Sequence, residues 1–217
     1  MSSSNAALSE ASSTSSFEER PAIYPRAVRI AASVAALLSV FIAVWIIFGI
    51  GSWLRLYVPL ENEYLFALLG LLVPIVFLAR DVRGATRQGS VPAFDYALAL
   101  LAFAIAMTFA FKSDSILFEG WVYLAPNYAK VLSIMMWVLV LEGLRRSSGL
   151  VIFIICALFS LYPVFSDLAP GILRAQATAF DITAGFYIFS SEGILGVPFG
   201  AFATLVIGFL IFGVALQ

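Results

Sequence analysis

The chain has 217 residues, of which 62% are hydrophobic and 12% are charged, and its formal net charge is −1. About 25% of the residues in a typical soluble domain are charged, so this chain lacks the polar surface that a water-soluble core requires. The composition therefore excludes a soluble globular protein and predicts an all-α fold, a polytopic transmembrane helix bundle.

Apolar runs alternate with polar or broken connections after a polar start. Residues 1–28 are rich in serine and alanine and contain few large apolar side chains, so we predict a disordered, cytoplasmic leader. A spanning helix needs about 20 apolar residues. We expect about six spans, at 30–54, 64–79, 93–111, 129–144, 149–165 and 194–216. The polar or broken connections are 81–92, 112–127 and 166–193.

The connection at 166–193 has a helical pattern just before the final span. Apolar side chains recur there at intervals of four and three, at Leu173, Ala177, Phe180, Ala184 and Tyr187. This spacing places them on one face of a helix. We expect an interfacial helix along the membrane, with Phe180 and Tyr187 on its apolar face. The alternative is an ordinary extramembrane helix that packs on the spans.

The basic residues predict the orientation of the spans. Numbering the sides alternately puts eight basic residues on the side of the N-terminus: Arg20, Arg26, Arg29, Arg80, Arg83, Arg87, Arg145 and Arg146. The other side receives four: Arg55, Lys112, Lys130 and Arg174. Because short cytoplasmic loops carry an excess of lysine and arginine, we expect the first side, with both termini, to be cytoplasmic.

The residue types present leave little room for catalysis. The chain has no histidine, which excludes imidazole metal sites and His-containing triads. The single cysteine, Cys156, lies in an apolar run and cannot form an internal disulfide. No basic patch indicates nucleic acid. We expect a protein that is not an enzyme, with no catalytic residue, cofactor, metal ligand or nucleic-acid partner.

Ionisable residues near a span are candidates for function because they are costly in a membrane. Asp95 lies at the start of the predicted third span, where it could also be an interfacial residue or an N-cap. Glu142 and Arg146 lie four residues apart near the end of the fourth span, so they share a helix face and can pair. Beside the local ion pair, the functional hypothesis is that Glu142, Arg145, Arg146 and Asp95 form a contact that fixes one helix domain against another.

A second candidate is the segment 189–204, where glycines alternate with apolar residues around a proline. Its notable residues are Ser191, Glu192, Gly193, Gly196, Pro198, Gly200 and Thr204. Small residues permit close helix packing, whereas irregular backbone at membrane depth lines ion and substrate cavities in transporters. The spacing alone leaves both interpretations open.

These two segments together resemble a known family. The first pattern is Leu-Glu-small-x-Arg-Arg followed by an apolar helix that ends in Tyr and Pro-Gly: Leu141, Glu142, Arg145, Arg146, Tyr162, Pro170 and Gly171. The second is a Ser-Glu-Gly-Ile-x-Gly-x-Pro helix: Ser191, Glu192, Gly193, Ile194, Gly196, Pro198, Gly200, Thr204, Phe212 and Gly213. In order and spacing they are similar to the fused permease of tripartite ATP-independent periplasmic (TRAP) transporters of the TAXI type. The similarity covers residues 130–217, about 40% of the chain.

The resemblance implies a function and a division of the chain. Residues 29–146 correspond to a four-helix scaffold like the small subunit, and 147–217 to the first helices of an incomplete large transport domain. Such a permease lies in the bacterial inner membrane and takes up small organic acids delivered by a periplasmic binding protein. Sodium is the implied coupling ion, with its site outside this chain, although the sequence leaves proton coupling open. The chain is then mostly scaffold and not transport-competent alone.

The resemblance also implies partners. They are the lipid bilayer, the binding protein and the remainder of the transport domain, fused or encoded separately, because the chain stops within an apolar run. We expect the outer surfaces 55–63, 112–128 and 166–193 to meet the binding protein and to expose Trp121 and Tyr123. The alternative function is a stand-alone membrane anchor or assembly protein without transport activity.

Overall fold

The computed structural model describes residues 24–87 and 89–216, so most of the predicted leader lies outside the described residues. Their regular elements are helices, as expected, apart from one isolated antiparallel bridge between Arg80 and Thr86. The α-helices are α2 Arg26–Ile47, α3 Ile50–Trp53, α4 Glu61–Ala79, α5 Ala93–Phe111, α6 Ser113–Phe118, α7 Trp121–Leu124, α8 Asn127–Ser148, α9 Leu150–Leu161, α10 Phe180–Phe189, α11 Val197–Ala201 and α12 Ile207–Ala215. Three 3-10 turns, Tyr162–Val164, Ser166–Leu168 and Gly171–Leu173, follow α9, and a π-helical turn, Phe202–Val206, joins α11 to α12.

Prolines and glycines set several of these boundaries. Prolines in extended conformation directly precede α2, α5 and α8. Gly49 and Gly149 take positive φ angles of 60° and 88°, which separate α2 from α3 and α8 from α9. Glycine adopts this conformation without the steric penalty that a side chain brings. Pro74 lies inside α4, and the helix continues through it.

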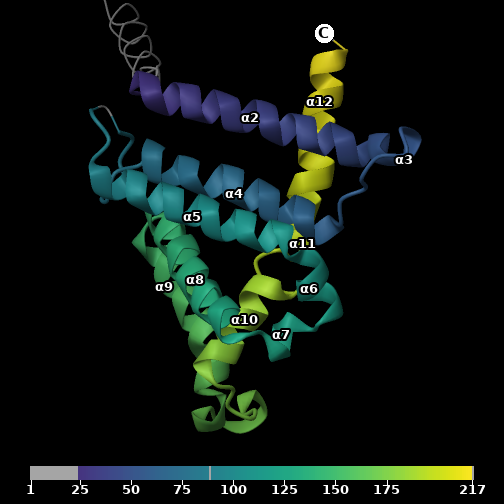
Figure 1. Ribbon diagram of the computed structural model, residues 1–217. Helices are drawn as coiled ribbons and strands as arrows, with labels where there is room; N and C mark the ends of the chain where they lie inside the picture. Colours follow the sequence, from purple (N-terminus) through teal and green to yellow (C-terminus); the bar gives the residue numbers. More distant parts are fainter. Residues whose placement is uncertain (1–23, 88, 217) are drawn as a thin grey trace, which may run out of the picture.

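The helices α2, α4 and α5 run side by side, and α8 and α9 form a hairpin that descends from one end of this layer (Figure 1). The antiparallel pair α4 and α5 is the closest. A Cβ added at Gly70 would lie 3.0 Å from the Cβ of Ala106, so small residues allow the two backbones to approach. The helix α12 crosses α2 near the C-terminal end of α2 (Figure 1).

Within the described residues, five helical segments are long and apolar enough to cross a membrane: Val28–Ile47, Glu61–Ala79, Ala93–Phe111, Asn127–Ser148 and Val197–Val214. The segment expected as a further span at 149–165 is a shorter apolar helix instead. Gly149 starts α9 and a 3-10 turn at Pro163 ends it after 12 residues. At about 1.5 Å per residue it measures about 18 Å, less than the hydrocarbon core of about 30 Å.

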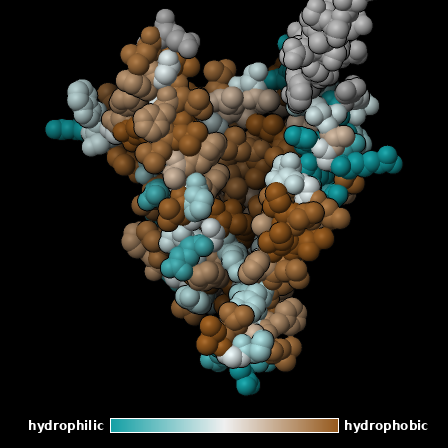
Figure 2. Space-filling view, turned by 180° about the vertical axis from the view of Figure 1, so that it is seen from behind, coloured by the Kyte–Doolittle hydropathy of each residue, from teal (hydrophilic) through white to brown (hydrophobic). Residues whose placement is uncertain are grey.

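The surface is as apolar as the composition predicts. Hydrophobic residues cover much of the face in Figure 2, and hydrophilic residues lie at its edges and in patches within its lower half. Large apolar side chains such as Leu37, Phe159 and Phe209 are more than 70% exposed. Such a surface suits contact with lipid or with other helices rather than with water.

The helix before the last span is shorter than the pattern predicted and packs on other helices. Leu173 lies in a 3-10 turn and Ala177 in non-helical chain, so neither joins the face of α10. Phe180 packs edge-on against Trp137 of α8, with ring centroids 5.6 Å apart. The hydroxyl of Tyr187 donates a hydrogen bond of 3.4 Å to the Phe159 carbonyl oxygen of α9. These contacts match the alternative of a helix packed on the spans.

The expectation that Trp121 is exposed is wrong. Trp121 is buried because its ring packs edge-on against Tyr128 and Phe189, and its indole nitrogen donates to Glu119 at 2.9 Å. Tyr123 is exposed, as expected. The Trp121 ring therefore anchors α7 and α10 to the bundle.

Candidate functional site

A buried cluster of ion pairs joins the α4–α5 loop, the start of α5 and the end of α8. Its centre is Asp95, whose side chain is fully buried. One carboxylate oxygen accepts a hydrogen bond of 2.7 Å from Arg146 Nη1, and the other accepts one from Arg87 Nη2. Arg146 is fully buried and Arg87 nearly so. Asp95 makes no capping hydrogen bond to its own helix, so it acts as the ion-pair acceptor that links α5 to α8.

Glu142 extends this cluster along α8. It accepts a hydrogen bond of 2.7 Å from Arg146 Nε, which is the pair expected from the four-residue spacing. Arg145 holds the same carboxylate with two nitrogens, at 2.7 and 2.8 Å, and donates through Nη1 to the Val82 carbonyl oxygen at 2.8 Å. The structure thus brings together Asp95, Glu142, Arg145 and Arg146, the four residues proposed as a domain contact. That role itself stays a prediction.

The α4–α5 loop is shaped to reach this cluster. The Asp81 carboxylate accepts hydrogen bonds from the backbone N–H groups of Arg83 and Ala85, which closes a tight turn. Gly84 takes a positive φ of 82°, and a Cβ there would lie 3.1 Å from the Arg146 carbonyl oxygen. The turn therefore packs directly on the end of α8 and places Arg87 over Asp95. No pattern in the sequence singles out Arg87 as a member of this cluster, because its partner Asp95 lies in another element.

The cluster is electrostatically demanding. Removing charges from water costs several kcal/mol per ion, and the attraction compensates only when the hydrogen bonds are well made. Within the described part of the chain, Arg146 Nη2 and Arg87 Nε have no protein partner. The Arg146 guanidinium also lies 5.1 Å from the centroid of the Phe77 ring, a favourable cation–π arrangement. The arrangement suits fixing helices, because Arg146 joins α8 to α5 and Arg145 joins α8 to the α4–α5 loop.

The glycine-rich segment forms the irregular connection between α10 and α11. Gly193 and Gly196 are needed there, because a Cβ at Gly193 would lie 2.2 Å from the Tyr187 carbonyl oxygen, and one at Gly196 would lie 2.9 Å from two carbonyl oxygens. Gly200 has no atom within 4 Å of such a position. The side chains of Ser191 and Glu192 are exposed. This segment therefore combines close backbone packing with irregular structure.

A π-helical turn follows this segment and is held by α4. The hydroxyl of Tyr64 is buried and donates a hydrogen bond of 2.6 Å to the Ala203 carbonyl oxygen inside the turn. The Thr204 hydroxyl is exposed and bonds back to the Gly200 carbonyl oxygen at 2.8 Å. Single π-helical turns are frequent at functional sites. Tyr64 was missed from the sequence, where its only signal is a hydroxyl near the start of an apolar run. Pro198, the other member of the motif, is exposed at the start of α11.

A partly exposed ion pair attaches α10 to α8. Lys130 Nζ donates to the Asp181 carboxylate at 2.8 Å, and both side chains are partly exposed. The hydrogen bond from Lys130 holds the pKa of Asp181 below its usual value. Elsewhere in the described chain, no group of three or more Cys, Asp or Glu residues is arranged to hold a metal ion.

The five long apolar helices define the class of this protein, an all-α, multi-pass membrane protein. Comparison with family models, with curated proteins and with solved structures gives no significant match.

Proposed function

We propose that this chain is a permease component of a TRAP-type secondary transporter in the bacterial inner membrane, and that it acts mainly as the scaffold. In this proposal a sodium gradient drives the uptake of small organic acids, which a periplasmic binding protein delivers. Transport requires further helices of the large domain, fused or on a separate chain. The coupling-ion site lies on those helices.

The observation that carries this proposal is the position of the Leu-Glu-small-x-Arg-Arg motif. Its Glu142, Arg145 and Arg146 enter the buried cluster with Asp95 and Arg87. The cluster fastens α8 to the α4–α5 hairpin, which gives a frame with few ways to deform. A scaffold domain needs such rigidity, because the transport domain moves relative to it.

The arrangement of basic residues supports the proposed orientation. Arg87 and Arg146 meet at Asp95, and Arg145 reaches the α4–α5 loop at Val82. Arg26 and Arg29 line a cleft that the same loop closes at Gly89 and Ser90. These residues of the proposed cytoplasmic side therefore gather at one end of the α2–α4–α5 layer, as the positive-inside rule requires.

Uptake measurements in cells test the proposal. Strains with and without the gene are supplied with a panel of labelled small mono- and dicarboxylic acids, in buffers containing sodium or only potassium. We expect deletion to abolish the uptake of at least one acid, and that uptake to need sodium and the binding protein. Uptake that is unchanged for the whole panel would reject the transporter and leave the anchor or assembly protein.

The scaffold role has its own readout. Complementation with Glu142→Gln should lower uptake only in proportion to the amount of folded protein in the membrane, because Glu142 fixes helices and does not touch the substrate. The matched control is Arg83→Gln, which removes an exposed charge of the α4–α5 loop outside the candidate sites. A Glu142→Gln protein present at normal levels, with uptake lost or with altered KM, would contradict a purely structural role.

A further inference from the structure

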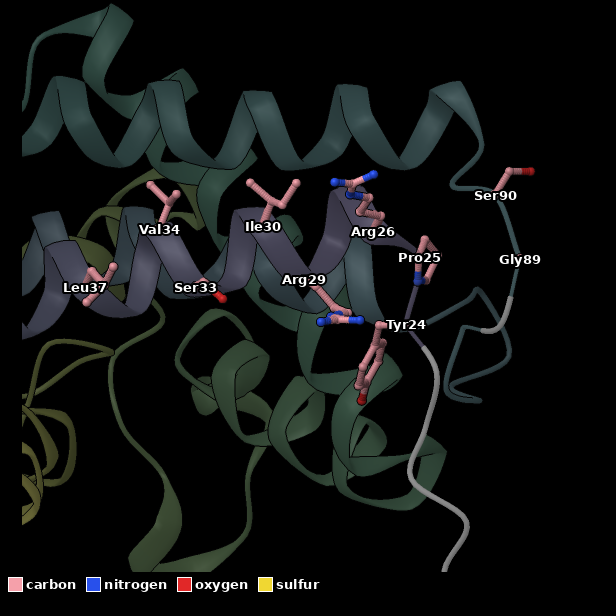
Figure 3. Close-up of a pocket in the computed structure, with 10 residues that line it drawn as sticks. All are labelled: Tyr24, Pro25, Arg26, Arg29, Ile30, Ser33, Val34, Leu37, Gly89 and Ser90. Carbon is pink, nitrogen blue, oxygen red and sulfur yellow. The ribbon is translucent and has the colours of Figure 1, made fainter. Parts of the chain in front are cut away.

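An open cleft lies at the N-terminal end of α2, where the helix meets the α4–α5 loop. Its volume is about 870 Å3. Figure 3 shows its wall along α2, with Gly89 and Ser90 of the loop beyond the N-terminal end of the helix. The lining residues from α2 are Arg26, Arg29, Ile30, Ser33, Val34 and Leu37, preceded by Tyr24 and Pro25. The spacing of three and four residues places them on one helix face, and all six α2 residues are exposed.

The cleft is polar at one end and apolar along the rest. Arg26 and Arg29 stand at the end of the helix, on either side of it in Figure 3, and Ser33 lies further along the helix. Ile30, Val34 and Leu37 continue from the arginines into the membrane-spanning part of α2. A ligand that fills this cleft must therefore have an anionic head and an apolar body.

The charges at the polar end have no counter-charge among the described residues. Among the described residues, neither Arg26 nor Arg29 has a carboxylate partner, unlike Arg87, Arg145 and Arg146. The first turn of α2 contains no acidic residue and its N-terminus has no side-chain cap. The helix dipole and the two guanidinium groups then favour the same sign of charge, since arginine binds phosphate oxygens in a bidentate manner.

We propose that this cleft binds the headgroup phosphate of an anionic glycerophospholipid, with one acyl chain along Ile30, Val34 and Leu37. Arg26 and Arg29 supply the positive charges that hold the phosphate. A free phosphate ion shares the headgroup chemistry but leaves the apolar wall exposed, so the lipid is the better fit. The proposal depends on α2 spanning a bilayer and does not depend on the transport function.

Native mass spectrometry of the full chain in neutral detergent tests this site. The protein is titrated with phosphatidylglycerol, and separately with phosphatidylcholine of the same acyl chains. We expect retained phosphatidylglycerol and an apparent affinity at least about tenfold above that for phosphatidylcholine, because a lost charge-assisted contact of about 1.4 kcal/mol is tenfold in affinity. Equal retention of the two lipids would overturn the proposal.

Matched variants locate the binding. Arg26→Gln/Arg29→Gln should remove the preference for phosphatidylglycerol, whereas Arg55→Gln/Lys112→Gln removes two exposed charges outside the cleft and should keep it. Ser33→Phe fills the cleft without changing its charge and should also weaken retention. Circular dichroism confirms that each variant is folded. The same lipid preference in the first double variant, or full displacement of the lipid by millimolar inorganic phosphate, would overturn the lipid site.

Discussion

The two ends of α4 are held in opposite ways. Near its C-terminal end, Phe77 lies against Arg146 in a cluster built from charged side chains of distant segments. Near its N-terminal end, Tyr64 donates one hydrogen bond to a π-helical turn, and the chain before that turn packs tightly through Gly193 and Gly196, which have no side chains. The first end depends on paired charges, and the second on one hydrogen bond to a segment whose preceding glycines pack against their own chain.

This difference predicts how each end fails. At the charged end, removing one group leaves its partners buried and unpaired, so a single substitution is expensive. At the glycine end, the change in the free energy of unfolding depends on whether an added methyl group has room. A glycine-to-alanine substitution can therefore destabilise the protein at one glycine and stabilise it at another. Substitutions near the two ends of α4 therefore test two separate physical causes of stability: paired charges at one end and close backbone packing at the other.

The largest expected effect is that of Asp95→Ala. It leaves Arg146 and Arg87 buried without their shared acceptor, so we expect a loss of about 3–5 kcal/mol in the free energy of unfolding. Unfolding in mixed micelles of SDS and a mild detergent measures it. The control Asp167→Ala removes an exposed carboxylate and should change stability by less than about 0.5 kcal/mol. Equal unfolding curves for the two variants would show that the cluster does not hold the helices together.

Gly193→Ala tests the other end. Its Cβ would lie 2.2 Å from the Tyr187 carbonyl oxygen, and backbone moves less easily than a side chain, so we expect a loss of about 1–3 kcal/mol. Gly200→Ala, in the same motif but with open space around it, should be neutral or stabilise the helix by up to about 1 kcal/mol. The same unfolding assay measures both. Equal destabilisation by both would mean that the motif does not depend on close packing at Gly193.

Tyr64→Phe should cost about 1–2 kcal/mol, because it leaves the buried Ala203 carbonyl oxygen without its donor. Tyr96→Phe removes a hydroxyl from an exposed tyrosine of α5 and serves as the control, with no expected change. Hydrogen exchange of the amides in 200–207 provides a local readout, and faster exchange is expected only for Tyr64→Phe. Unchanged exchange would show that the π-helical turn is stable without α4.

The smallest effect is the pH dependence of the Lys130–Asp181 pair. Because the pKa of Asp181 is lowered in the folded protein, the pair stabilises the fold above the unfolded-state pKa. That contribution is lost as the pH falls through the folded-state pKa. The pair is partly exposed, so we expect less than about 1 kcal/mol. Comparing unfolding at neutral and acidic pH for the wild type and Asp181→Asn measures it; an unchanged acid dependence in the variant would assign the effect to other carboxylates.

Hydropathy was sufficient for much of the fold, because a membrane-spanning helix is a local property of about 20 residues. The Glu142–Arg146 pair was also local and could be expected from a four-residue spacing. By contrast, Asp95 contacts Arg146, which is 51 residues further along the chain, and no periodic pattern in the sequence predicts that contact. Its burial follows from how α5 packs against α8, which the sequence does not state.

Two expectations were wrong because tertiary contacts and backbone breaks cannot be seen in the composition. Trp121 was expected at an exposed surface because tryptophan is common at membrane interfaces, but the rings of Tyr128 and Phe189 enclose it. The apolar run at 149–165 has the composition of a span, yet Gly149 and Pro163 limit the α-helix to 12 residues. Composition measures how well a segment tolerates lipid, whereas tertiary contacts and backbone breaks decide where it ends.

The position of Asp95 between its two arginines also implies an order of assembly during synthesis. Arg87 precedes Asp95 by eight residues, so this pair is complete as soon as the α4–α5 hairpin has been made. Arg146 follows 51 residues later, which is about 3–10 s at about 5–20 residues per second. Until then, Arg87 alone neutralises the carboxylate. We therefore expect the nearby arginine to be the first partner of Asp95, before α8 has been made.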